Sequence, residues 1–436
     1  MDSTFFFNPV LISITLLCIL CLCKVNVLLS IMISAITAGI CAKMNITQIM
    51  NTFIAGMGNN SETALSYILL GAFAASMTQT GLAGTLAKKI SKLIKNNKFI
   101  LFLILTIIAM LSQNLIPVHI AFIPIIIPPL LHVMNVLKID RRAVACCLTF
   151  GLKMPYIVIP AGFGLIFQGL IADNIAQNGI EIIKSDVWKY TTILGLGMFI
   201  ALLMSIFVSY RKPREYKDTE IVITENINGD KFTKKHYITL FAAFATLLVQ
   251  LVTKSLPLGA LVGLGIIFGT GTIKHHKMDN LIDEGVGLMG YIAFVMLVAA
   301  GFAAVLKSTG GIETFVNSVM VFIPANKLIA SALMLLTGLF ITIGIGTSFG
   351  TIPILAVIFV PVCINLQFNP AETVAVIAAA AALGDAGSPA SDTTLGPTAG
   401  LNADGQHNHI TDTCIPTFLH YNIAIILFAL ISVLVF

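Results

Sequence analysis

Two carboxylates stand where a membrane helix is expected to end or break. The segment 384–394, Gly-Asp-Ala-Gly-Ser-Pro-Ala-Ser-Asp-Thr-Thr, directly follows the apolar run 374–383. A charge at the centre of a bilayer costs about 2.5–3.5 kcal/mol even on a lenient scale, so Asp385 and Asp392 are expected to be paired, hydrated or functional. Glycine and proline would break the helix and free backbone carbonyls. Such oxygens predict a small-cation site, and the alternative is a polar loop outside the membrane.

The elements that must position these residues occur twice. An offset of 229 residues relates three pairs of residues: Gly81 and Gly310, Pro124 and Pro353, Pro160 and Pro389. Each half has an interrupted helix, at 143–172 (broken near 153–155 and 160–162) and at 373 to about 401. Paired Gly/Pro-interrupted segments at matching positions are the best sequence indication of a transporter site.

Composition predicts the fold class. Hydrophobic residues make up 57% of the 436 residues and charged residues 10%, against about a quarter in soluble domains, and the mean hydropathy is +0.96. We expect an all-α polytopic membrane protein with two inverted repeats of five transmembrane helices, 1–210 and 237–436, joined by a cytoplasmic linker, 211–236. Each repeat would hold one re-entrant hairpin, at about 99–135 and 328–366. Charge does not exclude the alternative in which each hairpin is two full spans, which gives fourteen spans.

The distribution of basic residues predicts the topology. In the ten-span arrangement, 18 of the 25 Lys and Arg residues lie on one side, six lie on the other, and Lys153 lies within the membrane. The richer side is cytoplasmic by the positive-inside rule, so both termini face outward. The net charge of +5 therefore needs no nucleic-acid partner. The eight cysteines lie almost entirely in apolar runs, where cysteine is a small hydrophobe.

Polar residues also mark the expected tips of the two hairpins, 112–117 and 344–351. Exposed carbonyls and hydroxyls at such tips favour a cation, and helix N-termini favour an anion; helix packing alone also uses hydroxyls. Lys153 could replace a bound cation, attract an anionic substrate group, neutralise a carboxylate, or extend toward the interface. His119 and His132 could carry protons. His407 and His409 with Asp404 and Asp412 lack further ligands for a metal site, and a gate or solvated loop is favoured.

The motifs resemble a known family. Gly346-Thr347-Ser348-Phe349-Gly350-Thr351 and the 384–394 segment are similar to the paired motifs of NhaC-type Na⁺/H⁺ antiporters. The tail from Gly396 to Asp412, with Tyr421-Asn422, resembles a subgroup with candidate amino-acid carriers, histidine among their substrates. The resemblance implies the ion transporter superfamily: inverted repeats, two hairpins, two broken helices, elevator-like movement and homodimers. Ala386-Gly387 departs from the bulkier residue after Gly-Asp in many antiporters, and a roomier site would suit an organic substrate.

The sequence therefore predicts a multi-pass, cation-coupled secondary transporter of the bacterial inner membrane, with Na⁺ and H⁺ as coupling ions and no organic cofactor. The alternative is Na⁺- or H⁺-coupled amino-acid uptake; a passive channel or an enzyme is disfavoured, because the polar tips are isolated and no hydrolase motif is present. Asp385 would exchange H⁺ for Na⁺. The expected ion ligands are Thr347, Ser348, Thr351, Asp385, Ser388, Asp392, Thr393, Ser112 and Asn114; the expected substrate ligands are Gln113, His119, Lys153, Ser391 and Thr394.

Overall fold

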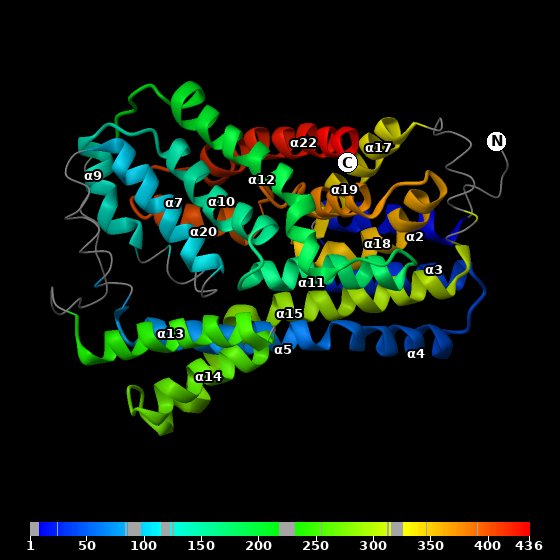
Figure 1. The fold of residues 1–436 in the computed structure, drawn as a ribbon, viewed down its shortest axis with the longest axis horizontal. Helices are drawn as coiled ribbons and strands as arrows, with labels where there is room; N and C mark the ends of the chain where they lie inside the picture. The colour runs from blue at the N-terminus through cyan, green and yellow to red at the C-terminus, as the bar shows by residue number, and fades with distance from the viewer. Residues whose placement is uncertain are drawn as a thin grey trace.

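A computed structural model describes most of the chain and is drawn in Figure 1. The described residues are 8–23, 25–82, 85, 97–114, 123, 126–217, 232–253, 255–311, 314, 326–345, 347–389 and 391–436. Within these residues every regular element is a helix, and this confirms the predicted all-α class. Most of the basic cluster 88–98, the linker from 218 to 231, and His119 lie outside the described residues.

The helices fall into two series, one before and one after the predicted linker, whose last three residues, 234–236, already belong to α13. The first series is α2 (Pro9–Leu22), α3 (Val27–Cys41), α4 (Ile46–Met57), α5 (Ser61–Gln79), α7 (Lys98–Asn114), α9 (Leu131–Val136), α10 (Arg141–Val158), α11 (Phe163–Gln177) and α12 (Val187–Met204), which continues as a π-helical turn, Ser205–Ser209. The second series is α13 (Lys234–Thr253), α14 (Leu256–Gly269), α15 (Met278–Ser308), α17 (Lys327–Ile345), α18 (Ser348–Asn365), α19 (Pro370–Ala382), α20 (Asp392–Leu401), α21 (Ile415–Thr417) and α22 (Ile423–Val435).

The two series repeat at the offset found in the sequence. Helices α14, α17, α19 and α20 each begin 229 residues after α3, α7, α10 and α11, respectively. The same offset relates backbone conformations: Gly81 and Gly310 have φ of 74° and 66°, and Lys138 and Gln367 have φ of 49° and 54°. Because left-handed φ is uncommon outside glycine, its recurrence at Lys138 and Gln367 supports a common architecture for the two halves. Their opposite orientation in a membrane stays a prediction.

Both expected interruptions are present, with one difference. Helices α10 and α11 meet at a bend of 48° at 159–162, and α19 and α20 are separated by residues 383–391. The break expected at 153–155 is wrong, because α10 runs through Pro155 to Val158. Neighbouring helices can supply partners for the backbone groups that proline leaves free, so proline is tolerated inside membrane helices. The hairpin stretch 328–366 is also formed by two helices, α17 and α18, with Thr347 between them.

The helices form two connected parts. Helices α4, α5, α13, α14 and α15 run together along the lower side of Figure 1, and α7, α10, α12, α19, α20 and α22 lie above them. The long helices α5 and α15 pack side by side through glycine: a Cβ on Gly71 would lie 2.6 Å from the carbonyl oxygen of Gly285. Small residues allow this approach of membrane helices.

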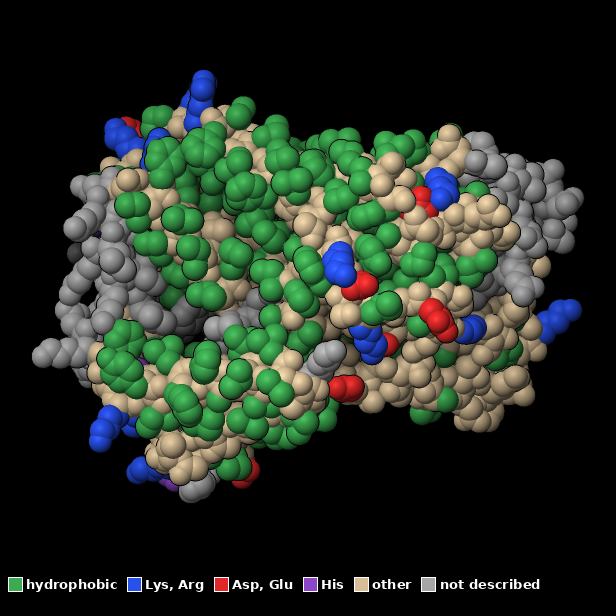
Figure 2. Space-filling model, viewed as in Figure 1, with side chains coloured by type: hydrophobic (Ala, Val, Ile, Leu, Met, Phe, Trp, Pro, Cys, Tyr) green, Lys and Arg blue, Asp and Glu red, His purple; other side chains and the backbone are tan. Residues whose placement is uncertain are grey.

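Length and exposure fit a membrane. In the described part of the chain, five helical segments and the bent α10–α11 pair are long and apolar enough to span a bilayer. Exposed large hydrophobic side chains cover much of the face in Figure 2. One of the five segments, Ser348–Asn365, has 83% of its length buried inside the protein. Helix α18 is therefore an internal element, and its first residue, Ser348, belongs to the candidate site.

Candidate ion and substrate site

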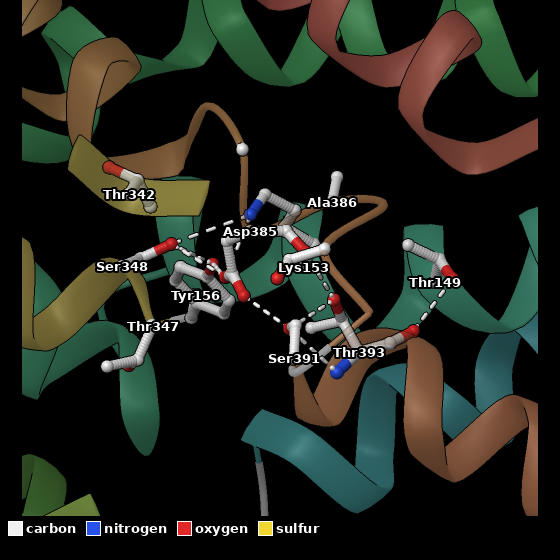
Figure 3. Close-up of polar contacts among 12 residues, drawn as sticks. Thr149, Lys153, Tyr156, Thr342, Thr347, Ser348, Asp385, Ala386, Ser391 and Thr393 are labelled. Atoms are coloured by element: carbon white, nitrogen blue, oxygen red, sulfur yellow. Dashed lines mark hydrogen bonds and ion pairs between the residues drawn. The ribbon is translucent and has the colours of Figure 1, made fainter. Parts of the chain in front are cut away.

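The centre of the site is a buried ion pair between the two halves. Lys153 lies on α10, and Asp385 lies in the break between α19 and α20. The Lys153 Nζ atom is 2.9 Å from Asp385 Oδ2 (Figure 3). The Lys153 side chain is fully buried, and 7% of the Asp385 side chain is exposed. Among the roles that the sequence allows for Lys153, neutralising a carboxylate is the one that this geometry matches.

Three further hydroxyls complete the contacts of this carboxylate. Ser348, the first residue of α18, donates to Asp385 Oδ2 at 2.7 Å. Tyr156 donates to the same oxygen at 3.1 Å and lies 3.0 Å from the Ser348 hydroxyl. Ser391 donates to Asp385 Oδ1. Because residues i and i+3 share a helix face, α10 presents both Lys153 and Tyr156 to Asp385.

The backbone freed by the broken helix is satisfied by side chains. The Asn422 amide oxygen accepts from the Gly384 N–H at 3.1 Å, and its amide nitrogen donates to the Ala386 carbonyl at 3.0 Å. Thr149 on α10 donates to the Thr393 carbonyl at 2.8 Å. A membrane-embedded break needs such partners, since unsatisfied backbone groups in an apolar medium are costly. These bonds tie the backbone on both sides of Asp385 to α10 and to Asn422.

A small cavity adjoins the ion pair. Its volume is about 30 Å³, which is room for an ion or one or two water molecules. Gln113, Thr347, Asp392 and Thr393 contribute polar lining beside Asp385. Gln113 is 4% exposed, and within the described part of the chain its Oε1 atom accepts no hydrogen bond. An oxygen without a donor fits a cation better than it fits an anion.

Helix ends add to the electrostatics of the cavity. Asp392 lies in the first turn of α20, and Thr347 is the N-cap residue of α18 but makes no side-chain capping bond. The N-terminal end of a helix carries partial positive charge and favours nearby carboxylates. The N-terminal ends of α18 and α20 therefore add partial positive charge beside Asp385 and Asp392.

Not every expected ligand reaches the carboxylate or the cavity. The hydroxyls of Ser112, Thr351 and Thr394 bond to carbonyls of their own helix or turn, at Ala109, Thr347 and Ser388 plus Ser391, respectively. Ser388 is buried away from the cavity lining. The Asn114 side chain and the whole of His119 lie outside the described residues. The residues brought together are Lys153, Ser348, Asp385 and Ser391 in the polar cluster, and Gln113, Thr347, Asp392 and Thr393 around the cavity.

Sequence reasoning missed the aromatic residues of the site. Tyr67, Phe163 and Phe349 line the cavity with Tyr156, and Phe349 packs edge-on against Tyr67 and Phe163. In an apolar run an aromatic residue is read as core. For Tyr156 a signal existed, because it follows Lys153 by three residues and precedes Asp385 by the offset of 229.

The room expected beside Asp385 is absent at Gly387. A Cβ there would lie 2.4 Å from Phe418 Cβ and 2.8 Å from its backbone nitrogen, and the residue has φ of 101°. The neighbouring Ala386 is fully buried. Glycine therefore serves close packing and a left-handed backbone, and leaves no space for an organic substrate.

In the expected histidine loop His407 is buried, whereas most of the residues around it are exposed. His407 Nε2 lies 2.7 Å from the Thr413 hydroxyl, and His409 bonds to Thr398 and to the Pro389 carbonyl. Burial lowers the pKa of His407 to about 4. Within the described residues no group of three or more potential metal ligands is found. His409 thus ties the loop to the broken helix.

A second buried ion pair joins the halves near that loop. Arg141, at the start of α10, forms two parallel bonds to Asp404 at 2.6 and 2.7 Å. It also donates to the Leu401 carbonyl at 3.0 Å, and its side chain is fully buried. Burial would raise the pKa of the Asp404 carboxyl, but the bonds from Arg141 hold it below its usual range. Bidentate pairs of this kind fix orientation as well as distance.

Comparison with known families decides the broad class. The profile of the Na⁺/H⁺ antiporter family matches residues 147–433, which include the broken helix and its ion pair. A second profile, described as a Na⁺-H⁺ antiporter family, matches residues 8–94.

The chain belongs to the Na⁺/H⁺ antiporter family.

Full-length relatives agree with this membership. Membrane protein VP2115 of Vibrio parahaemolyticus is 46% identical over 98% of this chain and 100% of its own. YuiF of Bacillus subtilis, named as a candidate amino acid transporter, is 45% identical with the same coverage. The family resemblance and the membrane localisation are thus confirmed, and the chain is a transporter of this antiporter family.

Solved structures share the fold. The YdaH transporter of Alcanivorax borkumensis matches with a TM-score of 0.61 at 12% identity, covering 89% of this chain and 88% of that one. MtrF of Neisseria gonorrhoeae matches with a TM-score of 0.57 at 16% identity, over 88% and 84%. At such identities the likeness concerns architecture alone. The family member described here is a polytopic helical transporter.

Proposed function

We propose that this antiporter-family protein exchanges Na⁺ for H⁺ across the bacterial cytoplasmic membrane, and that Lys153 and Asp385 carry the exchange. The observation behind this proposal is the buried 2.9 Å pair beside the small cavity. In this pair the Lys153 ammonium group binds the same carboxylate that a transported cation would need as a ligand. The Lys153 ammonium is thus a tethered competitor of Na⁺.

The exchange follows from the cost of leaving a buried charge without a partner. When Na⁺ enters the cavity and binds the Asp385 carboxylate, Lys153 loses its partner in a fully buried position. An unpaired buried ammonium is costly, so the lysine releases its proton and becomes a neutral amine. When Na⁺ leaves, Lys153 takes up a proton and restores the ion pair. The charge at this pair is the same before and after, and one Na⁺ has replaced one H⁺.

The lining residues have separate roles in this cycle. Asp392, Thr393 and Thr347 would supply oxygen ligands beside Asp385, and the Gln113 amide oxygen would supply another. Sodium sites use hard oxygen ligands, and Ca²⁺ or Mg²⁺ would want more carboxylates. Tyr156 and Ser348 would hold Asp385 Oδ2 in place while Lys153 moves away.

Coupled amino-acid transport is the second candidate function. The name given to YuiF favours it, and a zwitterion could place its carboxylate on Lys153 and its ammonium on Asp385. The cavity of about 30 Å³ is too small for histidine in this conformation, and Gly387 adds no space. This function would therefore require an opening of the site that Na⁺ exchange does not. Assembly into a homodimer, implied by the family resemblance, belongs to the proposal for either substrate.

Transport in proteoliposomes tests the proposal. With Na⁺ higher inside the vesicles, Na⁺ efflux should bring protons in and acidify the lumen, reported by a pH dye, in proportion to Na⁺ flux. Parallel vesicles with labelled amino acids, histidine included, measure the second candidate. Sodium-driven uptake of an amino acid without proton movement would replace antiport with symport. Proton movement that persists in Lys153→Gln would remove lysine from the exchange.

A further inference from the structure

A second, larger cavity lies away from the ion pair, at one end of the molecule. Its volume is about 370 Å³, and it opens between the start of α7, the turn before α10 and the end of α12. Four cationic side chains line it: Lys98, Lys138, Arg211 and Lys212. Its size is in the range of small-molecule sites.

The positive charge of this cavity is largely uncompensated. Lys138 pairs with Glu215 at 2.6 Å, and Asp140 in the lining pairs with Arg142. Within the described residues, no salt bridge involves Lys98, Arg211 or Lys212. Three cations that form no ion pair with another described residue line one hollow, and they predict an anionic ligand.

The other wall of the cavity is apolar and exposed. Phe99 and Phe207 stack at 5.5 Å between ring centroids, and their exposed fractions are 49% and 51%. The exposed apolar side chains continue along α7 to Leu103 and along α12 to Leu203. Figure 2 shows Lys and Arg side chains at the upper left, beside a broad hydrophobic surface. A ligand that fits this cavity would carry negative charge at one end, to bind the cations, and an apolar group at the other, to pack against the aromatic wall.

We infer that this cavity binds an anionic phospholipid, with its phosphodiester among Lys98, Arg211 and Lys212 and an acyl chain along Phe99 and Phe207. Excess positive charge on the cytoplasmic side is expected of any inner-membrane protein. What distinguishes this place is the hollow and its continuous apolar wall. Basic pockets between helices on this side are suited to anionic headgroups. A free phosphate would use the cations alone and would gain nothing from the aromatic wall.

Lipid binding to the purified full-length protein, measured by native mass spectrometry, tests the inference. Phosphatidylglycerol should bind more tightly than phosphatidylcholine with the same acyl chains. Arg211→Gln/Lys212→Gln should weaken phosphatidylglycerol binding by roughly 30-fold. The two lost cations each strengthen binding to an anionic headgroup by a similar factor, and the two factors multiply. Phe207→Ala should weaken it while leaving all cations in place.

The control is Lys234→Gln/Lys235→Gln, which removes the same charge from exposed residues on the predicted cytoplasmic side but outside the cavity. It should leave lipid binding near the wild-type value. Equal loss in both double variants, equal binding of phosphatidylcholine, or full competition by inorganic phosphate would each overturn the inference. Unfolding temperatures without added lipid verify that every variant is folded.

Discussion

Tyr156 donates a hydrogen bond to Asp385 at 3.1 Å across a separation of 229 residues, the offset that relates the two halves of the chain. The two residues are therefore counterparts that meet at the centre of the site. Lys153 joins them from one turn earlier on α10. The site thus combines a carboxylate from one half with a phenol and an ammonium from the other, and its chemistry is asymmetric.

Removing the charge of Asp385 should abolish coupling. In Asp385→Asn the amide keeps size and one oxygen but cannot neutralise Na⁺ or pair with Lys153. We expect Na⁺ affinity to fall by about 100-fold or more, as for loss of a charged contact, with membrane insertion intact. Proteoliposome transport measures this, with Asp173→Asn, an exposed carboxylate paired with Lys184, as control. Wild-type Na⁺ dependence in Asp385→Asn would make Asp385 structural.

The ion pair should show strong energetic coupling. Lys153→Gln or Asp385→Asn alone leaves one buried group without its charged partner, and such changes destabilise by about 3–5 kcal/mol. The double substitution should destabilise by less than the sum, because it leaves no unpaired charge. Chemical unfolding in detergent gives the four free energies of the cycle. Additive losses would show that the two side chains do not interact in the protein.

Adding a side chain at Gly387 should disturb packing rather than substrate choice. In Gly387→Val the new atoms overlap Phe418, and β-branching opposes the φ of 101°. We expect a loss of at least about 1–3 kcal/mol of folding free energy. Gly265→Ala is the matched control, because nothing lies within 4 Å of its Cβ and alanine favours the helix. A Gly387→Val protein of wild-type stability that loses only organic-substrate binding would contradict this.

Stability should fall in acid because of His407. Burial lowers its pKa to about 4, below the value near 6.5 of an unfolded chain. Between these values the unfolded state binds more protons, so the free energy of unfolding decreases as the pH falls from about 6.5 to about 4. His407→Gln keeps a group able to bond Thr413 and should flatten this dependence. Unfolding temperatures at pH 7.5 and 5 measure it, with His276→Gln, an exposed site, as control.

The predicted topology can be read from two native cysteines. Cys23 and Cys41 are both exposed; Cys23 directly follows α2 and Cys41 is the last residue of α3, so they lie at opposite ends of this helix pair. Basic residues place the Cys23 end inside and the Cys41 end outside. An impermeant maleimide added to intact cells should modify Cys41 and spare Cys23. A cysteine introduced at position 225, in the linker, should also be spared; the reverse pattern would invert the topology.

The features that could be predicted from the sequence are those that depend on internal repetition and on composition. Two broken helices follow from Gly and Pro at matching positions, and the membrane class follows from 57% hydrophobic residues. The contact between Lys153 and Asp385 could not be deduced, because a pair 232 residues apart is set by packing of α10 against the break. Pro155 misled the prediction of a break, since α10 continues through Pro155 to Val158. Tyr156 was hidden by its apolar neighbours.

The bonds between α10 and the second broken helix lie at three successive levels. Arg141 holds Asp404, Thr149 holds the Thr393 carbonyl, and Lys153 holds Asp385. These three bonds cross-link the two segments, so we expect them to move together. In the elevator-like movement that the family resemblance implies, a substrate bound at Asp385 would move with both segments relative to the long helices α5 and α15. Spin labels placed across these bonds should then keep their distance in every state, and labels placed between α10 and α5 or α15 should not.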